Sequence, residues 1–182
     1  RTEQDQLSKI TSYHESGING HSYFEVRAND GNRLFYGKTA DAKALKDQQN
    51  HVNVWLLSRI EDRNGNYIEY HYTTTQDSYR INKIRYSGNS NSAISPAFTV
   101  EFLYGDRIDA ETCAVGDVLC RMDKKLEKIK VYNGSSLMYT YQFNYQQPNP
   151  SSGLPYHLLS RSGFETDQEH LNPTKIQWGS NN

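Results

Sequence analysis

The sequence has little cysteine, almost no net charge and no long apolar run. Only 2 of its 182 residues are cysteines, and they lack the CxxC spacing or nearby histidine pair of a zinc site. Basic and acidic residues number 20 and 21, so no global field would recruit nucleic acid or an anionic membrane. No apolar stretch approaches the roughly 20 residues of a membrane span. These features argue against a zinc module, a nucleic-acid binder and a membrane-spanning helix.

Motifs of catalysis are missing as well. The sequence has no GxSxG elbow, phosphate-binding loop or dinucleotide glycine motif, and its histidines form no HxH or HExxH group. Candidate carboxylates for glycoside hydrolysis are Glu61, Asp62, Glu69 and Glu101. Candidate calcium ligands, without the spacing of an EF-hand, are Asp106, Asp109, Glu111 and Asp117. Because glutamates on strands ordinarily face solvent, we expect no enzyme, no cofactor and no bound metal.

Tyrosine is abundant, with 14 residues in the chain. Tyrosine favours strands and covers half-wet sheet faces, because its ring can be buried while its hydroxyl keeps a partner. The mean hydropathy is low, at −0.87, but the apolar residues are patterned, which is not typical of a disordered chain. The composition therefore indicates either a tyrosine-faced β-sheet or a platform on which sugars stack.

The segment from residue 54 to residue 72 predicts a β-hairpin. Its turn is Asn64-Gly65, the dipeptide preferred in a type I′ turn, where both central residues have positive φ. The incoming arm carries Trp55, Leu57 and Ile60, and the outgoing arm alternates Ile68, Tyr70 and Tyr72 with polar residues. This period of two allows one face to be buried while the other meets water.

Similar units occur along the rest of the chain. Further hairpins are expected at 23–27 with 34–36 and at 126–132 with 137–145, and further strands at 81–86 and 98–104 and around Ile176 and Trp178. We call Tyr139, Tyr141, Phe143 and Tyr145 the aromatic arm. Helix-favouring residues predict a short helix over 41–48, a surface loop is expected at 89–96, and the segment 105–123 reads as irregular.

A pattern of an aliphatic, a polar, a basic and an isoleucine residue repeats at positions 7–10, 57–60, 81–84 and 126–129. A single hairpin is marginal in water, so neighbouring units must extend one another. We therefore predict an all-β fold: a meandering antiparallel sheet of hairpins with at most one short helix. Residues 1–182 would form a single module, with 1–22 poorly ordered or an edge strand and 23–178 the hairpin repeats. We expect this module to be a piece of a longer protein.

The signature segment, residues 55–72, carries a family resemblance. Its matching positions are Trp55, Leu57, Ile60, Asp62, Asn64, Gly65, Asn66, Ile68, Tyr70 and Tyr72. It resembles the SpvB-type virulence-plasmid protein and the B component of insecticidal toxin complexes, which are relatives of Rhs proteins with tyrosine-aspartate (YD) repeats. Matches at 24–37, 102–109, 126–131 and 172–178 keep the family's order, so the resemblance covers residues 23–178.

The resemblance implies a structural role. The chain would be a module of a large secreted or cell-surface protein, helping its other domains, a propeller or an Rhs shell, to enclose or present a toxin or effector. The propeller repeats, the self-cleaving Rhs core and an ADP-ribosyltransferase domain are not found in this sequence. The alternative is a carbohydrate-binding or cell-surface interaction module that uses the aromatic sheet faces to bind a glycan.

Cys113 and Cys120 have two interpretations. A turn at Gly116 could bring their Cα atoms within the roughly 7 Å that a disulfide requires. Such a bridge would stabilise the chain by about 2 kcal/mol through loop closure, and export would favour it. Two free, half-buried thiols are the other interpretation.

Overall fold

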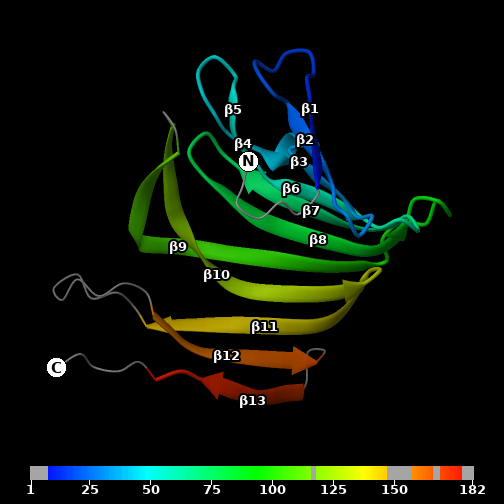
Figure 1. Ribbon diagram of the computed structural model, residues 1–182. Coiled ribbons are helices and arrows are strands. Elements are labelled where there is room, and N and C mark those ends of the chain that lie inside the picture. The colour runs from blue at the N-terminus through cyan, green and yellow to red at the C-terminus, as the bar shows by residue number, and fades with distance from the viewer. Residues whose placement is uncertain (1–7, 116–117, 147–156, 166–168, 178–182) are drawn as a thin grey trace. The chain divides into compact units, whose positions relative to one another are not determined.

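The computed structural model describes residues 8–115, 118–146, 157–165 and 169–177 (Figure 1). The first strands are β1 (Lys9–Tyr13), β2 (Tyr23–Arg27), β3 (Arg33–Tyr36), β4 (Lys43–Lys46), β5 (Val52–Trp55), β6 (Leu57–Glu61), β7 (Asn66–Thr74) and β8 (Tyr79–Asn89). The later strands are β9 (Phe98–Val115), β10 (Val118–Asn133), β11 (Ser136–Gln146), β12 (His157–Glu165) and β13 (Glu169–Lys175). One turn of 3₁₀ helix, η1 (Ala40–Ala42), completes the described elements. The predicted all-β class is confirmed.

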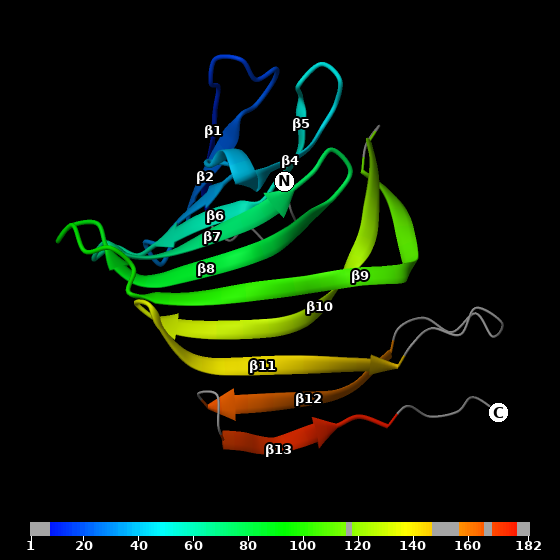
Figure 2. The same ribbon diagram turned by 180° about the vertical axis from the view of Figure 1, so that it is seen from behind.

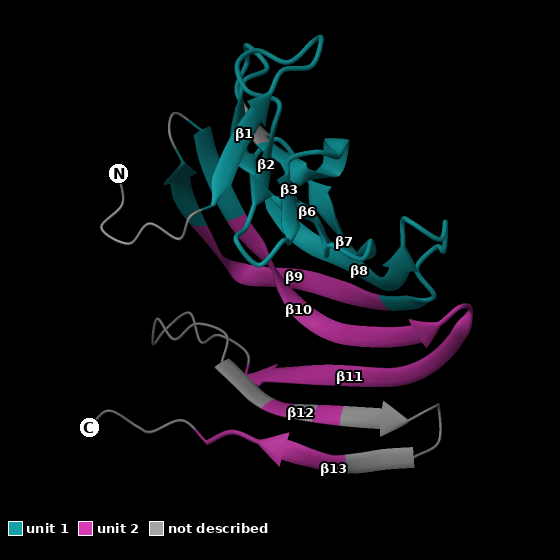
Figure 3. Cartoon of the chain, turned by 45° about the vertical axis from the view of Figure 1, so that its right-hand side comes forward, with its two compact units in different colours: residues 1–99, 112–121 teal, residues 100–111, 122–182 magenta. Residues whose placement is uncertain are grey.

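The chain divides into two compact units (Figure 3). The first comprises residues 1–99 and 112–121, and the second comprises 100–111 and 122–182. Strands of the first unit follow the order β1-β2-β3-β6-β7-β8, and β4 pairs separately with β5. The second unit contains residues 100–111 of β9, residues 122–133 of β10, and β11, β12 and β13, in the order β9-β10-β11-β12-β13. The strand pairs whose register the structure describes are antiparallel, and the single module proposed for residues 1–182 stays a prediction.

The hairpin predictions hold in both units. β2 pairs with β3, and β6 with β7, while β7 and β8 continue the meander side by side (Figure 2). In the second unit β10 pairs with β11 across a turn at Gly134, whose φ of 57° suits the first central position of a type II′ turn. β1 is an edge strand of its sheet, as one of the two expectations for residues 1–22 had it. Residues 1–7 and Trp178 lie outside the described residues.

The helix predicted over residues 41–48 is wrong. Only Ala40–Ala42 form one 3₁₀ turn, and the chain then enters β4, where Lys43 lies opposite Trp55 and Ala44 opposite Val54. An isolated helix of this length is marginal in water, so local propensity gives way to tertiary contacts. Ala42 is 0% exposed and Ala44 is 1% exposed, so the extended path buries both alanines.

The irregular segment predicted between Gly105 and Asp123 is also wrong. β9 continues to Val115 and β10 begins at Val118, so the described part of the segment is extended strand. Branched residues such as Ile108 and Val118 favour strands, and pairing between neighbouring strands supports them where the alternation is poor. The expectation of an irregular segment over 105–123 missed this pairing.

Candidate functional site

The turn of the signature segment is held by Asp62. Its Oδ1 accepts the backbone N–H groups of Asn64 and Asn66, both at 2.8 Å, and its Oδ2 accepts the Asn66 side-chain amide at 2.8 Å. The Asn66 amide is the main reason that the pKa of Asp62 lies below its ordinary value. Gly65 has a φ of 82°, whereas Asn64 is not among the residues with positive φ. The predicted type I′ turn is therefore wrong, because three residues, 63–65, close the hairpin with glycine alone in the left-handed region.

A second turn has the same backbone pattern and touches the first. Ala28 N–H donates to the Asn32 carbonyl at 2.9 Å, and Gly31 has a φ of 87°. Arg63 of the signature turn donates to the Asp30 carbonyl. A Cβ on Gly31 would lie 3.0 Å from Arg63 Nε, so glycine leaves room for that guanidinium. The two turns thus fix each other.

Trp55 lies outside the hairpin arm in which the sequence placed it. It belongs to β5, where its ring meets Phe24 edge-on with ring centroids 5.0 Å apart. Its Nε1 donates to the His21 carbonyl at 3.1 Å. A Cβ on Gly37 would lie 2.6 Å from the Trp55 ring, so glycine is required there. This tryptophan anchors β5 to the start of β2.

The remaining signature residues support the sheet. Tyr72 donates its hydroxyl to the Leu57 carbonyl at 2.8 Å, and burial raises the pKa of Tyr72 to about 12. Tyr70 lies opposite Ile84 on β8. Ile60 and Ile68 lie opposite each other on β6 and β7. The signature is thus a set of packing and turn positions.

An apolar row crosses the first five strands of this sheet. Direct cross-strand pairs connect Ile10, Val26, Leu34, Ile60 and Ile68, which we call the apolar row. Opposed residues on antiparallel strands share one face of a sheet. Ile10 is 66% exposed, and the other four are only half-buried. Five aliphatic side chains in a line therefore remain partly open to solvent.

The opposite face of the same strands carries a buried charge. Glu25 is 4% exposed and accepts from Arg27 Nε at 2.8 Å, Arg33 Nε at 2.9 Å and the Tyr13 hydroxyl at 3.0 Å. Burial alone would raise the pKa of Glu25. The hydrogen bonds from Arg33, Arg27 and Tyr13 outweigh that effect and lower the pKa to about 2. This carboxylate ties β1, β2 and β3 together.

A hollow of about 450 Å³ opens on the charged face, and we call it the charged groove. Six of its lining residues are Phe35, Lys38, Thr39, Arg59, Glu69 and His71. Phe35 is 3% exposed, and the Lys38 ammonium lies 4.1 Å from its ring centroid. Sequence reasoning missed this groove. The available signal was the alternation of charges along residues 59–61 and 69–71.

The aromatic arm of the second unit does not separate the two interpretations of its tyrosines. All four rings are half-buried, and so they lie neither in a closed core nor on an open platform. Tyr145 donates its hydroxyl to the Leu126 carbonyl at 2.7 Å, and burial raises the pKa of Tyr145. Val131 lies opposite Tyr139, and Ile129 opposite Tyr141.

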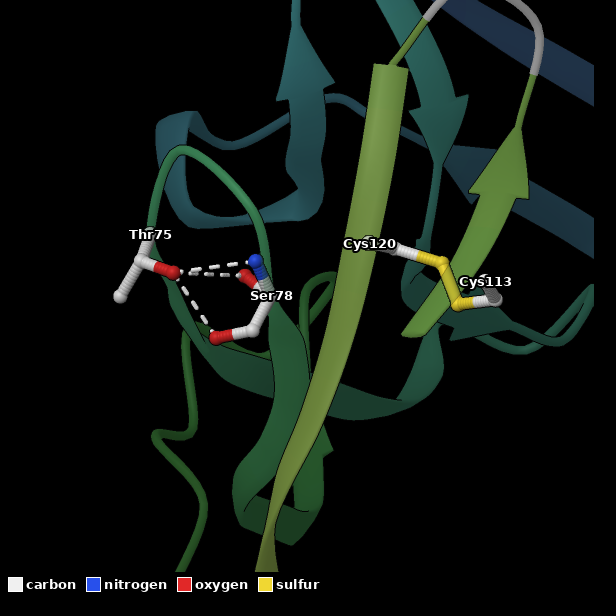
Figure 4. The surroundings of a disulfide bond; sticks show 4 residues. All are labelled: Thr75, Ser78, Cys113 and Cys120. Atoms are coloured by element: carbon white, nitrogen blue, oxygen red, sulfur yellow. Dashed lines mark hydrogen bonds between the residues drawn. A yellow bond between two sulfur atoms is a disulfide. The ribbon is translucent and has the colours of Figure 1, made fainter. Parts of the chain in front are cut away.

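Cys113 and Cys120 are joined by a disulfide in the structure, with Cα atoms 4.9 Å apart (Figure 4). Cys120 is 4% exposed and shares a small core cluster with Ala44. Val54 and Leu56 pack against that cluster. Beside the bridge, the Thr75 hydroxyl accepts the Ser78 backbone N–H at 3.0 Å and lies 2.8 Å from Ser78 Oγ, which closes the turn (Figure 4). The bridge therefore belongs to the core of the first unit.

Across the described ranges, no group of three or more histidine, cysteine, aspartate or glutamate side chains could hold a metal ion. Nor does any described helix have the length and apolar character needed to cross a membrane.

The comparisons with known proteins bear on this architecture. A family model described as "SpvB: Salmonella virulence plasmid 65kDa B protein" matches residues 1–152, well over half of the chain. The chain belongs to the SpvB family. This membership confirms the resemblance carried by the signature segment. No curated protein matches the sequence of the chain.

Solved structures share the fold of this SpvB-family chain. The N-terminal domain of effector protein SpvB from Salmonella typhimurium strain LT2 matches with a TM-score of 0.74 and 14% identity, over 91% of this chain and 67% of that chain. The Photorhabdus luminescens Tc holotoxin pore matches with a TM-score of 0.77 and 15% identity, over 95% of this chain. TcdB2-TccC3 matches with a TM-score of 0.74 and 15% identity, over 96% of this chain. The chain spans 11% of each of these two Tc chains.

Proposed function

We propose that the chain is a structural module, without catalytic activity of its own, of a large exported protein related to SpvB and Rhs/YD-repeat proteins. In that protein it contributes one wall of a β-sheet scaffold that encloses or presents a toxin or effector domain. Its partners are other domains of the same protein, such as a propeller or an Rhs shell.

The apolar row is the observation that supports this role. Aliphatic residues at one register position on five adjacent strands remain partly open, although covering such a side chain stabilises a protein by about 1 kcal/mol. Contiguous apolar surface of this kind marks an interface. A further domain packed on the row supplies the missing cover, which is the arrangement that a scaffold wall requires.

Hydroxyl-radical footprinting of the full-length protein tests this proposal. We expect Leu34, Ile60 and Ile68 to be oxidised several-fold more slowly in the full-length protein than in this chain expressed alone. Ile94, which is 53% exposed outside the row, serves as the control and should react equally in both. Equal oxidation of the row in both proteins contradicts the scaffold role. Glycan binding that is lost on Tyr141→Ala would instead favour the carbohydrate-binding alternative.

A further inference from the structure

The charged groove contains four polar groups with unused hydrogen-bonding capacity. Lys38 Nζ has a ring contact with Phe35 but no hydrogen-bond or ion-pair partner among the described residues. The exposed Thr39 makes no side-chain capping bond to η1. His71 Nε2 is buried and also lacks a hydrogen-bond partner within the described part of the chain. Of these three groups only His71 Nε2 is buried, and a buried polar atom without a partner is costly and uncommon in folded proteins.

Glu69 is the fourth of these groups. Its carboxylate lies 3.6 Å from Arg59 Nη1, 3.8 Å from Arg85 Nη1 and 3.9 Å from His71 Nε2. All three distances exceed that of a hydrogen bond. Glu69 therefore has neighbouring positive charge but no direct donor from the described side chains, and a ligand in the groove can supply one.

The groove carries charges of both signs, and its arginines are ion-paired with Glu61. Arg33, Arg59 and Lys38 face Glu61 and Glu69, so an anion meets two carboxylates and a cation meets three basic groups. The unused groups instead require a ligand that donates to Glu69 and accepts from Lys38. A hydroxyl group does both, since it has one donor and two acceptor lone pairs. The volume of about 450 Å³ lies within the range of small-molecule sites, about 300–1,000 Å³.

We propose that the charged groove binds a neutral sugar unit. Its hydroxyls donate to the Glu69 carboxylate, accept from Lys38 Nζ and Thr39 Oγ1, and pair with His71 Nε2 above the buried Phe35. This site lies in the first unit, on β7 and on the segment between β3 and η1, and it uses none of the tyrosines of the aromatic arm. It also does not depend on the scaffold role, because the groove lies on the face opposite the apolar row.

A printed array of neutral and acidic glycans, probed with the full-length protein, provides the first test. Calorimetry with the best-bound neutral sugar then measures the affinity of three variants. Lys38→Ala and Glu69→Gln should each weaken binding by about tenfold or more, because each removes a charge-assisted hydrogen bond. Lys9→Ala, which removes an exposed lysine outside the groove, should leave the affinity unchanged.

Three results overturn the proposal. One is an array on which no neutral glycan retains the protein. Another is a sugar that binds the wild-type protein and Lys38→Ala with the same affinity. The third is binding of acetate or inorganic phosphate that depends on Lys38 while sugars do not bind, which makes the groove an anion site. Lys38 is exposed, so its replacement leaves the fold intact and decides the matter even if Glu69→Gln unfolds.

Discussion

Both units are built from antiparallel strands, but they differ in how deeply their side chains are buried. Among the residues that the structure describes, five hydrophobic residues are buried, and all five belong to the first unit: Phe35, Ala42, Ala44, Val52 and Cys120. In the second unit, none of the side chains that the structure describes reaches that level of burial. The first unit folds η1, β4, β5 and the disulfide-bonded strand ends into its own core. The comparison teaches that covering segments, rather than strand sequence, create the core of this family member.

Introducing a charge into that core should have the largest effect. Ala44 is 1% exposed and clusters with Cys120. Ala44→Asp buries a carboxylate without a partner and should cost about 3–5 kcal/mol of unfolding free energy. Urea unfolding measures the loss. Thr140→Asp, half-buried opposite Lys130 in the second unit, is the matched control and should cost less than about 1 kcal/mol. Equal losses would remove the contrast between the units.

Glu25→Gln should have the next largest effect and should change the pH dependence of stability. The folded-state pKa of Glu25, about 2, lies below its ordinary value of 4.5. Its contribution, about 3 kcal/mol, is therefore present above pH 4.5 and lost as the pH falls toward 2. We expect the variant to be less stable at pH 7 and to lose less on acidification. Parallel acid-unfolding curves for the two proteins would contradict this.

Removing the disulfide should destabilise the first unit more modestly. The bridge closes a loop with a sequence separation of 7, for which loop entropy gives about 2 kcal/mol. The double variant Cys113→Ala and Cys120→Ala should lower the denaturation midpoint accordingly. Hydrogen exchange should quicken at Ala44 and Val54, whereas amides of β11 serve as the control and should keep their rates. Unchanged exchange at Ala44 would argue against a role for the bridge in the core.

Of two turn glycines, one in each unit, the glycine of the second unit should show the smallest effect. Gly65→Ala places a Cβ 2.7 Å from Asn91 Cγ at a φ of 82° and should cost about 2 kcal/mol. Gly134→Ala meets nothing within 4 Å at a φ of 57° and should cost only about 1 kcal/mol. Thermal unfolding of both variants measures the difference. A larger loss at Gly134 would show that turn packing in the first unit is unimportant.

Sequence reasoning succeeded where the determining interactions are local. The hairpins at 23–36 and 126–145 follow from alternation and turn residues a few positions apart, and they are confirmed. It failed at 41–48 because strand pairing with β5 outweighed helix propensity, and at 105–123 because apolar and polar residues alternate poorly there although the segment pairs with its neighbours in the chain. The charged groove escaped notice because its residues come from separate segments, such as Lys38 and Glu69.

The amino-acid sequence by itself determined the strand period, the positions of the glycine turns and the family, since each depends on residues close together in the chain. Only the tertiary structure decided which residues form a core. Cross-strand register aligned Val26, Leu34 and Ile60 into one row, and the path through η1 brought Ala44 beside Cys120. Burial depends on contacts between distant segments. The pattern of residues along one strand does not determine which face of the sheet other segments will cover.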